Sequence, residues 1–69
     1  MRKIEIHLNG DPREIDDDLS IGALLDRLGV PVAGVIVERN REVVQRSRFD
    51  EDVVRAGDRI EIVRLMGGG

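Results

Sequence analysis

The C-terminal carboxylate is the group in this sequence with the clearest potential for chemistry, because it follows a run of three glycines, Gly67, Gly68 and Gly69. A carboxylate accepts a nucleophile once an enzyme has converted it to an acyl-adenylate with ATP. To enter that enzyme, the residues before the carboxylate must pass a narrow channel in extended form, and glycine has no side chain to obstruct it. The run indicates either a reactive tail or an inert terminus, and its composition alone leaves both interpretations open.

Few other residues in the chain are candidates for catalysis. His7 is the only histidine, and it alternates with apolar residues of a predicted strand, so we expect it to be an exposed surface residue. Ser20 and Ser47 have no histidine nearby in the sequence to activate them. The chain has no cysteine, and the aspartates at 16–18 lack the spacing and the glycine of a calcium loop. We therefore expect no catalytic residue, no metal site and no bound cofactor, and the protein would not be an enzyme.

Composition limits the class of partner. At 69 residues the chain is one domain with a small core. Its 11 Lys and Arg are interspersed with 14 Asp and Glu, and Phe49 is the only aromatic ring, so the sequence offers neither a basic footprint nor a stacking platform for nucleic acid. It also contains no apolar run long enough to span a bilayer and no signal peptide. We expect a cytoplasmic monomer that binds neither nucleic acid nor membrane.

A hairpin is predicted at the start of the chain. Residues 3–8 alternate between apolar and polar types, which is the period of a strand with one buried face. The apolar members are Ile4, Ile6 and Leu8. Asn9 and Gly10 tolerate positive φ and predict a tight turn, after which residues 13–15 predict a short returning strand.

A short helix is predicted next, over an apolar stripe at helical spacing. The stripe consists of Ile21, Leu24, Leu25 and Leu28. Ser20 is placed to cap the first turn, and Leu19 could pack on Leu24 as a hydrophobic staple. Gly29 supplies a left-handed stop, and Pro31 prevents continuation.

The second half of the chain predicts three more strands. The consecutive apolar residues 35–37 indicate a strand that is either covered on both faces or lies inside the sheet. Val43 and Val44 predict a short strand, and the segment "RIEIVRL" at residues 59–65, with Ile60, Ile62 and the apolar residues that follow, predicts the last one. In the polar connection between them, we expect three apolar residues to hold a short helical turn on the core. These residues are Phe49, Val53 and Val54. The order of elements predicts a mixed sheet packed on one side by a single helix.

Over residues 1–69 the chain resembles the ThiS-like sulfur carriers of thiamine biosynthesis. The resemblance lies in the "NG" turn, "LSIGALLDRLG", "VIVERNREVV" and "AGDRIEIVRLMGGG". The residues that stand in the family's pattern are Glu38, Asn40, Gly57, Asp58, Ile60, Glu61, Ile62 and Val63. The resemblance implies an α+β, ubiquitin-like β-grasp fold, with a mixed four- to five-stranded sheet packed against one main helix. It also implies a folded domain over residues 1–66 and a flexible tail over residues 67–69.

The resemblance further implies a mechanism for the tail. A ubiquitin-activating-like enzyme would adenylate Gly69 with ATP, and sulfur from a cysteine desulfurase or another donor would replace the adenylate to leave a thiocarboxylate. Thiazole synthase would receive this sulfur for the thiazole ring of thiamine. Gly67 and Gly68 would let the tail pass through the narrow channel of the enzyme, and Leu65 and Met66 would help to dock the partner. The protein would then be a co-substrate.

Three alternatives stay open at this stage. The chain could carry sulfur for cysteine, methionine or molybdopterin biosynthesis, although the segment "IVRLM" lacks the aromatic and proline residues that are typical before the glycines of molybdopterin synthase small subunits. It could be a protein modifier that forms isopeptide bonds with lysines, as ubiquitin does. It could also be an interaction module in which Leu65 and Met66 form a docking surface, although these two residues could equally pack against the edge of the core.

Overall fold

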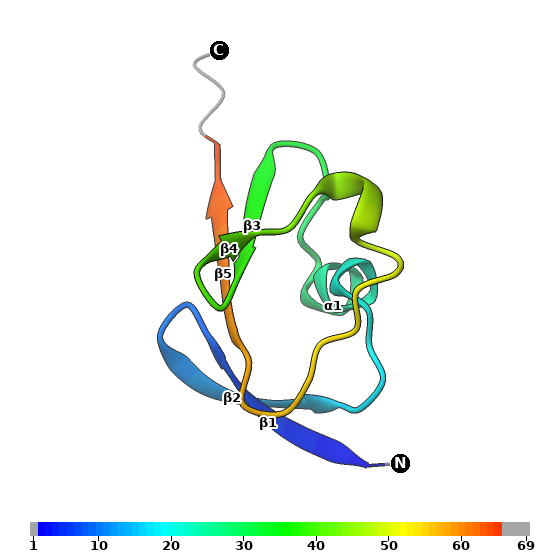
Figure 1. Cartoon of the computed structure of the whole chain (residues 1–69), viewed down its shortest axis with the longest axis vertical. Coiled ribbons are helices and arrows are strands. Elements are labelled where there is room, and N and C mark those ends of the chain that lie inside the picture. Colours follow the sequence, from blue (N-terminus) through cyan, green and yellow to red (C-terminus); the bar gives the residue numbers. More distant parts are fainter. Residues whose placement is uncertain (1, 66–69) are drawn as a thin grey trace.

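The computed structural model describes residues 2–65, so the predictions for Met66 and the three C-terminal glycines lie outside the described residues. The described chain forms one five-stranded sheet with the order β2-β1-β5-β3-β4 and one α-helix (Figure 1). The strands are β1 (Lys3–Leu8), β2 (Asp11–Asp16), β3 (Val35–Arg39), β4 (Glu42–Val43) and β5 (Arg59–Arg64). The helix α1 spans Ile21–Leu28, and a single 3₁₀ turn, η1, spans Arg46–Arg48. The mixed sheet with one main helix is the architecture that the sequence predicted.

The first hairpin has the turn that its sequence predicts. Strands β1 and β2 pair in antiparallel register from Lys3↔Asp16 to Leu8↔Asp11. Asn9 and Gly10 both adopt positive φ, at 49° and 88°, as a two-residue hairpin turn requires for strands of normal twist. Strand β2 begins before the predicted residues 13–15 and includes a proline, which this position tolerates because β2 lies at the edge of the sheet.

Local chemistry defines both ends of α1. The Oγ of Ser20 accepts a hydrogen bond from the Ala23 N–H at 3.0 Å, which satisfies one of the helix's unpaired first-turn donors. Gly29 ends the helix in the left-handed conformation, at φ 70°. The predicted cap and stop are therefore confirmed. The apolar stripe faces the core, where Ile21 and Leu24 are fully buried.

Strand β5 lies at the centre of the sheet, parallel to β1 and antiparallel to β3. Strand β3 lies between β5 and β4, so the prediction of a strand inside the sheet is correct. The alternative, a strand covered on both faces, is wrong because Val35 and Val37 are buried whereas Ile36 between them is 38% exposed. Figure 1 shows α1 on one face of the sheet, and on the other face Ile36 and Val63 are exposed.

The connection from β4 to β5 closes the core on the helix side. Phe49 at the end of η1 and Val54 further along are buried, while Val53 is half-buried and forms an isolated bridge with Ser20. The predicted helical turn held by apolar residues is thus confirmed. The buried core consists of Ile6, Ile15, Leu19, Ile21, Leu24, Leu25, Val35, Val37, Phe49, Val54 and Ile60.

Candidate functional site

The base of the tail is fixed by the sheet. The N–H of Leu65 donates to the carbonyl oxygen of Gly34 at 2.7 Å, so pairing between the two chain segments continues one residue beyond β5. Gly34 holds this position with a φ of 79°, a conformation that glycine adopts without strain. The side chain of Leu65 is 55% exposed. Of the predicted site residues, only Leu65 is described, and it lies on the surface where the chain leaves the sheet.

The sheet face opposite α1 carries an apolar patch next to that exit. The register places Ile36 of β3 directly opposite Val63 of β5, and both side chains are exposed, at 38% and 50%. Because side chains alternate between the two faces of a strand, Leu65 lies on the same face as Val63. Val43 of the neighbouring β4 is 58% exposed. We call Ile36, Val43, Val63 and Leu65 the outer patch. Exposed apolar side chains gathered in one place are typical of surfaces that contact another molecule.

A pair of carboxylates borders the outer patch. Glu38 of β3 lies directly opposite Glu61 of β5. This pair is on the same face of the sheet as Ile36 and Val63, two residues further along each strand. Like charges in this position destabilise a sheet. Among residues 2–65, no basic group lies within ion-pair distance of either glutamate. The patch therefore presents an apolar area with uncompensated negative charge beside it.

Asn9 ties the first hairpin to the base of the tail. Its N–H donates to the carbonyl oxygen of Ile60 at 2.9 Å, and its side-chain Oδ1 accepts from the N–H of Ile62 at 2.8 Å. Strand β1 itself pairs with β5 only as far as Leu8↔Ile60, so the asparagine extends this side of β5 beyond the end of β1. The sequence indicated Asn9 as a turn residue, and its second role was missed.

Asn40 and Asp58 secure the other end of β5. The Oδ1 of Asn40 accepts from the Arg59 N–H at 2.9 Å, and its Nδ2 donates to Asp58 Oδ1 at 3.2 Å. Asp58 is buried, accepts from the Arg55 N–H at 2.9 Å and lies 3.5 Å from the Arg39 guanidinium. These two members of the family pattern therefore hold the strand that leads to the tail.

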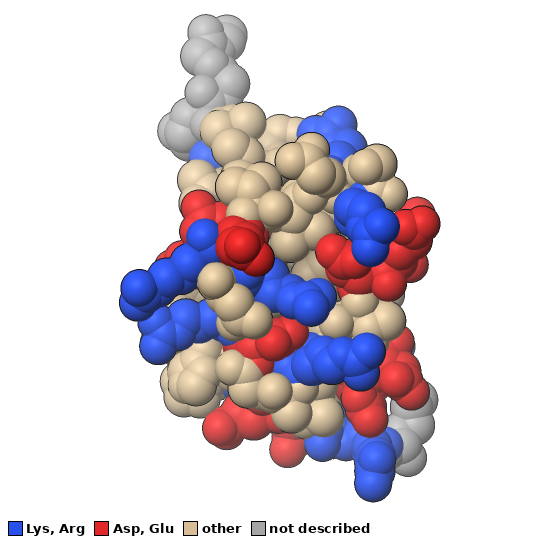
Figure 2. Space-filling model, viewed as in Figure 1, with Lys and Arg blue, Asp and Glu red and all other residues tan. Residues whose placement is uncertain are grey.

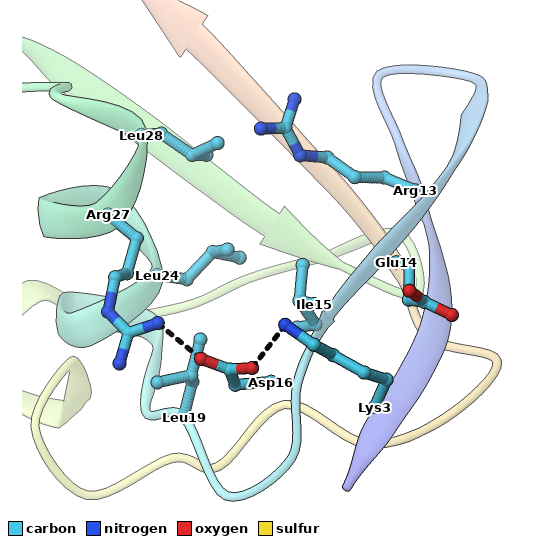
Figure 3. A pocket seen from close by; sticks show the side chains of 9 residues that line it. All are labelled: Lys3, Arg13, Glu14, Ile15, Asp16, Leu19, Leu24, Arg27 and Leu28. Carbon is cyan, nitrogen blue, oxygen red and sulfur yellow. Dashed lines mark hydrogen bonds and ion pairs between the residues drawn. The ribbon is translucent and has the colours of Figure 1, made fainter. Parts of the chain in front are cut away.

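The groove between β2 and α1 is stabilised by ion pairs (Figure 3). Asp16 bridges Lys3 at 2.6 Å and Arg27 at 2.5 Å, and so joins the hairpin to the last turn of the helix. Hydrogen bonds from Lys3 and then Arg27 hold the pKa of Asp16 at about 2, below its ordinary 3.8. The first aspartate of the acidic run is thus neutralised by two cations, and the sequence had not indicated these partners.

Within residues 2–65, the groups that the sequence offered for enzyme chemistry are not brought together. His7 is exposed on β1, as predicted, and the Ser20 hydroxyl is engaged with the Ala23 N–H. Ser47 lies exposed in η1. In residues 2–65, no three metal-ligating side chains gather in one place. None of the helices in this part of the chain is long and apolar enough to cross a membrane.

The comparison with protein families agrees with this geometry, since the model of the ThiS family matches residues 6–69. The chain belongs to the ThiS family. The sulfur carrier protein ThiS of Thermus thermophilus is 34% identical over 64 residues, which cover 93% of this chain and 98% of that protein. The crystal structure of the thiamine biosynthesis protein ThiS from Geobacter metallireducens has a TM-score of 0.83 and 39% identity, over 96% of this chain and all of that one.

Two further similarities extend the comparison. The thiazole synthase of Paramagnetospirillum magneticum is 39% identical over 66 residues, which are 96% of this chain but 20% of that protein. The chain thus spans about a fifth of the length of the thiazole synthases that it matches. SAMP1 from Haloferax volcanii has a TM-score of 0.58 at 20% identity over 99% of this chain and all of that one, which shows the fold alone. The fold is ubiquitin-like β-grasp, and the family is that of the small sulfur carriers of thiamine biosynthesis.

Proposed function

We propose that the carboxylate of Gly69 carries sulfur as a thiocarboxylate. A ubiquitin-activating-like enzyme transfers AMP from ATP to this carboxylate and releases pyrophosphate. The terminal sulfur of a cysteine desulfurase persulfide then attacks the acyl carbon, and AMP leaves. A thiol cleaves the resulting acyl disulfide and is itself oxidised to a disulfide, which leaves the thiocarboxylate on Gly69. Thiazole synthase receives this sulfur for the thiazole ring of thiamine, and the whole sequence takes place in the cytoplasm.

One observation carries this proposal: within the described residues, the sheet fixes the main chain as far as Leu65, which stands four positions before Gly69 in the sequence. The Leu65 N–H is bound to Gly34, and four residues follow it in the sequence. Four extended residues reach at most about 14 Å. This length suits insertion into the active site of another protein while the folded domain stays outside. Gly67 and Gly68 add no side-chain bulk to that insertion.

The outer patch supports docking on the adenylating enzyme. Its apolar side chains lie on the sheet face that leads to Leu65, where the chain leaves the sheet, so an enzyme that draws in the tail would also cover the patch. Leu65 belongs to this surface, and Met66 would extend the contact. Glu38 and Glu61 beside the patch favour an enzyme surface that carries Arg or Lys next to an apolar area.

The relatives named thiazole synthase support that enzyme as the sulfur acceptor. In those proteins, a segment 39% identical to this chain belongs to a polypeptide about five times as long. A carrier and its acceptor act on one another, and such joining keeps them at a high local concentration. We therefore assign thiazole synthase as the partner of the separate chain, in preference to the acceptors of cysteine, methionine or molybdopterin biosynthesis.

The test is intact-protein mass spectrometry after incubation with ATP, a thiamine-pathway adenylating enzyme and a sulfide source. A variant that lacks Gly69 is the control. We expect the full chain to gain the mass difference between one sulfur and one oxygen, and the control to gain nothing. If the enzyme charges a known carrier while this chain keeps its mass, the proposal is wrong. Covalent adducts with lysines of other proteins in cell lysate would instead indicate a modifier.

A further inference from the structure

The two sides of β5 are paired to different lengths. Towards β3, pairing runs from the start of β5 through Leu65, whose N–H donates to Gly34. Towards β1, strand pairing ends at Leu8↔Ile60, and the Asn9 side chain adds one more hydrogen bond, to Ile62. Beyond Ile62, the described chain places no strand beside β5 on this side, because the hairpin turns away at Asn9 and Gly10. The end of β5 nearest the tail therefore has an open edge.

The backbone of Arg64 faces this open edge. In a strand, the N–H and C=O of alternate residues point to the same neighbour. Ile62 donates towards β1 and Leu65 donates towards β3, so the N–H and C=O of Arg64 point in the same direction as those of Ile62. An unpaired strand edge of this kind is a template for another strand.

An apolar groove lies directly beside the open edge. It has a volume of about 390 Å³ and is lined by Leu8, Asn9, Leu28, Val30, Ile62 and Arg64. The four aliphatic residues pack on the core but are only partly buried. Arg64 is the one charged residue of the lining, its side chain is exposed, and it takes part in no ion pair within the described chain. The groove could therefore take an aliphatic side chain with a carboxylate next to it.

We propose that an extended segment of thiazole synthase adds to the sheet at the open edge of β5. Its main chain accepts a hydrogen bond from the Arg64 N–H, one of its aliphatic side chains enters the groove, and an acidic side chain pairs with the Arg64 guanidinium. The choice of thiazole synthase rests on the proposed function. Strand addition here would hold the residues before the tail in extended form, aligned with the direction in which β5 points. The adenylating enzyme would use the outer patch, on the opposite face of the sheet.

Residue-resolved amide hydrogen exchange by NMR tests the added strand directly. In the free protein, we expect the Leu65 amide to be protected by its hydrogen bond to Gly34, and the Arg64 amide, which faces the open edge, to exchange freely. In the complex saturated with thiazole synthase, we expect exchange at Arg64 to slow by at least about tenfold, because the amide has gained an acceptor. Leu65 is the internal reference, since its acceptor is present in both states. An Arg64 amide that still exchanges freely in the saturated complex would overturn the inference.

Two variants separate the main chain of residue 64 from its side chain. Arg64→Pro removes the N–H and breaks no pairing with β3, whereas Arg64→Ala removes the charge and keeps the N–H. Thermal unfolding should show that both variants fold. We expect Arg64→Pro to bind thiazole synthase about tenfold more weakly than Arg64→Ala, which corresponds to the loss of one main-chain hydrogen bond. Equal affinities would contradict strand addition.

The outcomes distinguish this inference from the proposed function. If the wild-type chain is converted to the thiocarboxylate and binds thiazole synthase without protection at Arg64, only the inference fails. If protection at Arg64 arises with the adenylating enzyme alone, the assignment of the occupant to thiazole synthase is wrong. If the chain neither gains sulfur nor binds thiazole synthase, both the proposed function and the inference fail.

Discussion

The Oδ1 of Asn9 accepts a hydrogen bond from the N–H of Ile62 at 2.8 Å, although the two residues lie 53 positions apart in the sequence. Asn9 is a turn residue with a φ of 49°, and Ile62 belongs to the central strand that leads to the tail. The asparagine therefore combines two tasks, since it turns the first hairpin and stands in for a strand partner that β1 no longer provides. This contact joins the first hairpin to the strand that precedes the C-terminal glycines.

Replacement of Asn9 should weaken this connection. In Asn9→Gly the turn keeps its positive φ but loses the side-chain acceptor, so we expect the free energy of unfolding to fall by about 1 kcal/mol. Asn9→Ala also places an ordinary side chain at positive φ, which adds about 1 kcal/mol of destabilisation. Urea unfolding of the three proteins measures both effects. An Asn9→Gly variant as stable as the wild type would show that the bond to Ile62 contributes nothing.

Asp58 should be the polar residue whose loss destabilises the described core most. It is 8% exposed and accepts hydrogen bonds from Arg55 and Asn40. Asp58→Ala leaves these donors without an acceptor and opens the turn before β5, so we expect a loss of about 2–4 kcal/mol in urea unfolding. Asp17→Ala is the matched control. The side chain of Asp17 accepts one described hydrogen bond, from the N–H of the adjacent Asp18, and this bond is exposed to solvent. Similar losses in the two variants would contradict a special role for Asp58.

The ion pairs of Asp16 predict a specific dependence of stability on pH. The pKa of Asp16 is about 2 in the folded protein and is expected near the ordinary 3.8 in the unfolded chain, so the unfolded state binds the proton more readily. The contribution of this carboxylate to the free energy of unfolding is therefore complete above about pH 4, and it disappears as the pH falls through about 2. Below that range both states are protonated.

The comparison of Asp16→Asn with the wild type isolates this effect. We expect the variant to unfold at lower urea concentration than the wild type at pH 7, and the difference to shrink steadily between about pH 4 and pH 2. Asp26→Asn is a control, because Asp26 is exposed and its carboxylate forms no ion pair with residues 2–65. If the difference in unfolding urea concentration between Asp16→Asn and the wild type stays constant over this pH range, the ion pairs of Asp16 are not its cause.

The outer patch should determine the affinity for the adenylating enzyme. Val63 is 50% exposed, so Val63→Lys should change the free energy of unfolding by no more than about 0.5 kcal/mol. We expect the same variant to bind the enzyme at least about tenfold more weakly, because it buries a charge in an apolar contact. Val32→Lys is the matched control, since Val32 is 39% exposed and lies outside the patch. Isothermal titration calorimetry gives the affinities, and equal losses for both variants would contradict docking through the patch.

Features that depend on neighbouring residues could be predicted from the sequence. The turn at Asn9 and Gly10 follows from their tolerance of positive φ, and the limits of α1 follow from Ser20 and Gly29. The alternation of Ile4, Ile6 and Leu8 placed the strand and its buried face. The reactive carboxylate of Gly69 also remains a prediction from sequence and resemblance, because the tail lies outside the described residues.

Features that depend on which strands become neighbours required the tertiary structure. The run of apolar residues in β3 left its two faces undecided, and only the position of α1 on one side of the sheet leaves Ile36 exposed opposite Val63. The bridges from Asp16 to Lys3 and Arg27, and the open edge at Arg64, likewise arise from the order of strands and the packing of the helix. Local conformational preference acts between adjacent residues, so the sequence alone determined the elements and their caps. Strand order and cross-strand contacts depend on burial of the whole core, and therefore only the folded chain decided how the surface around the tail is built.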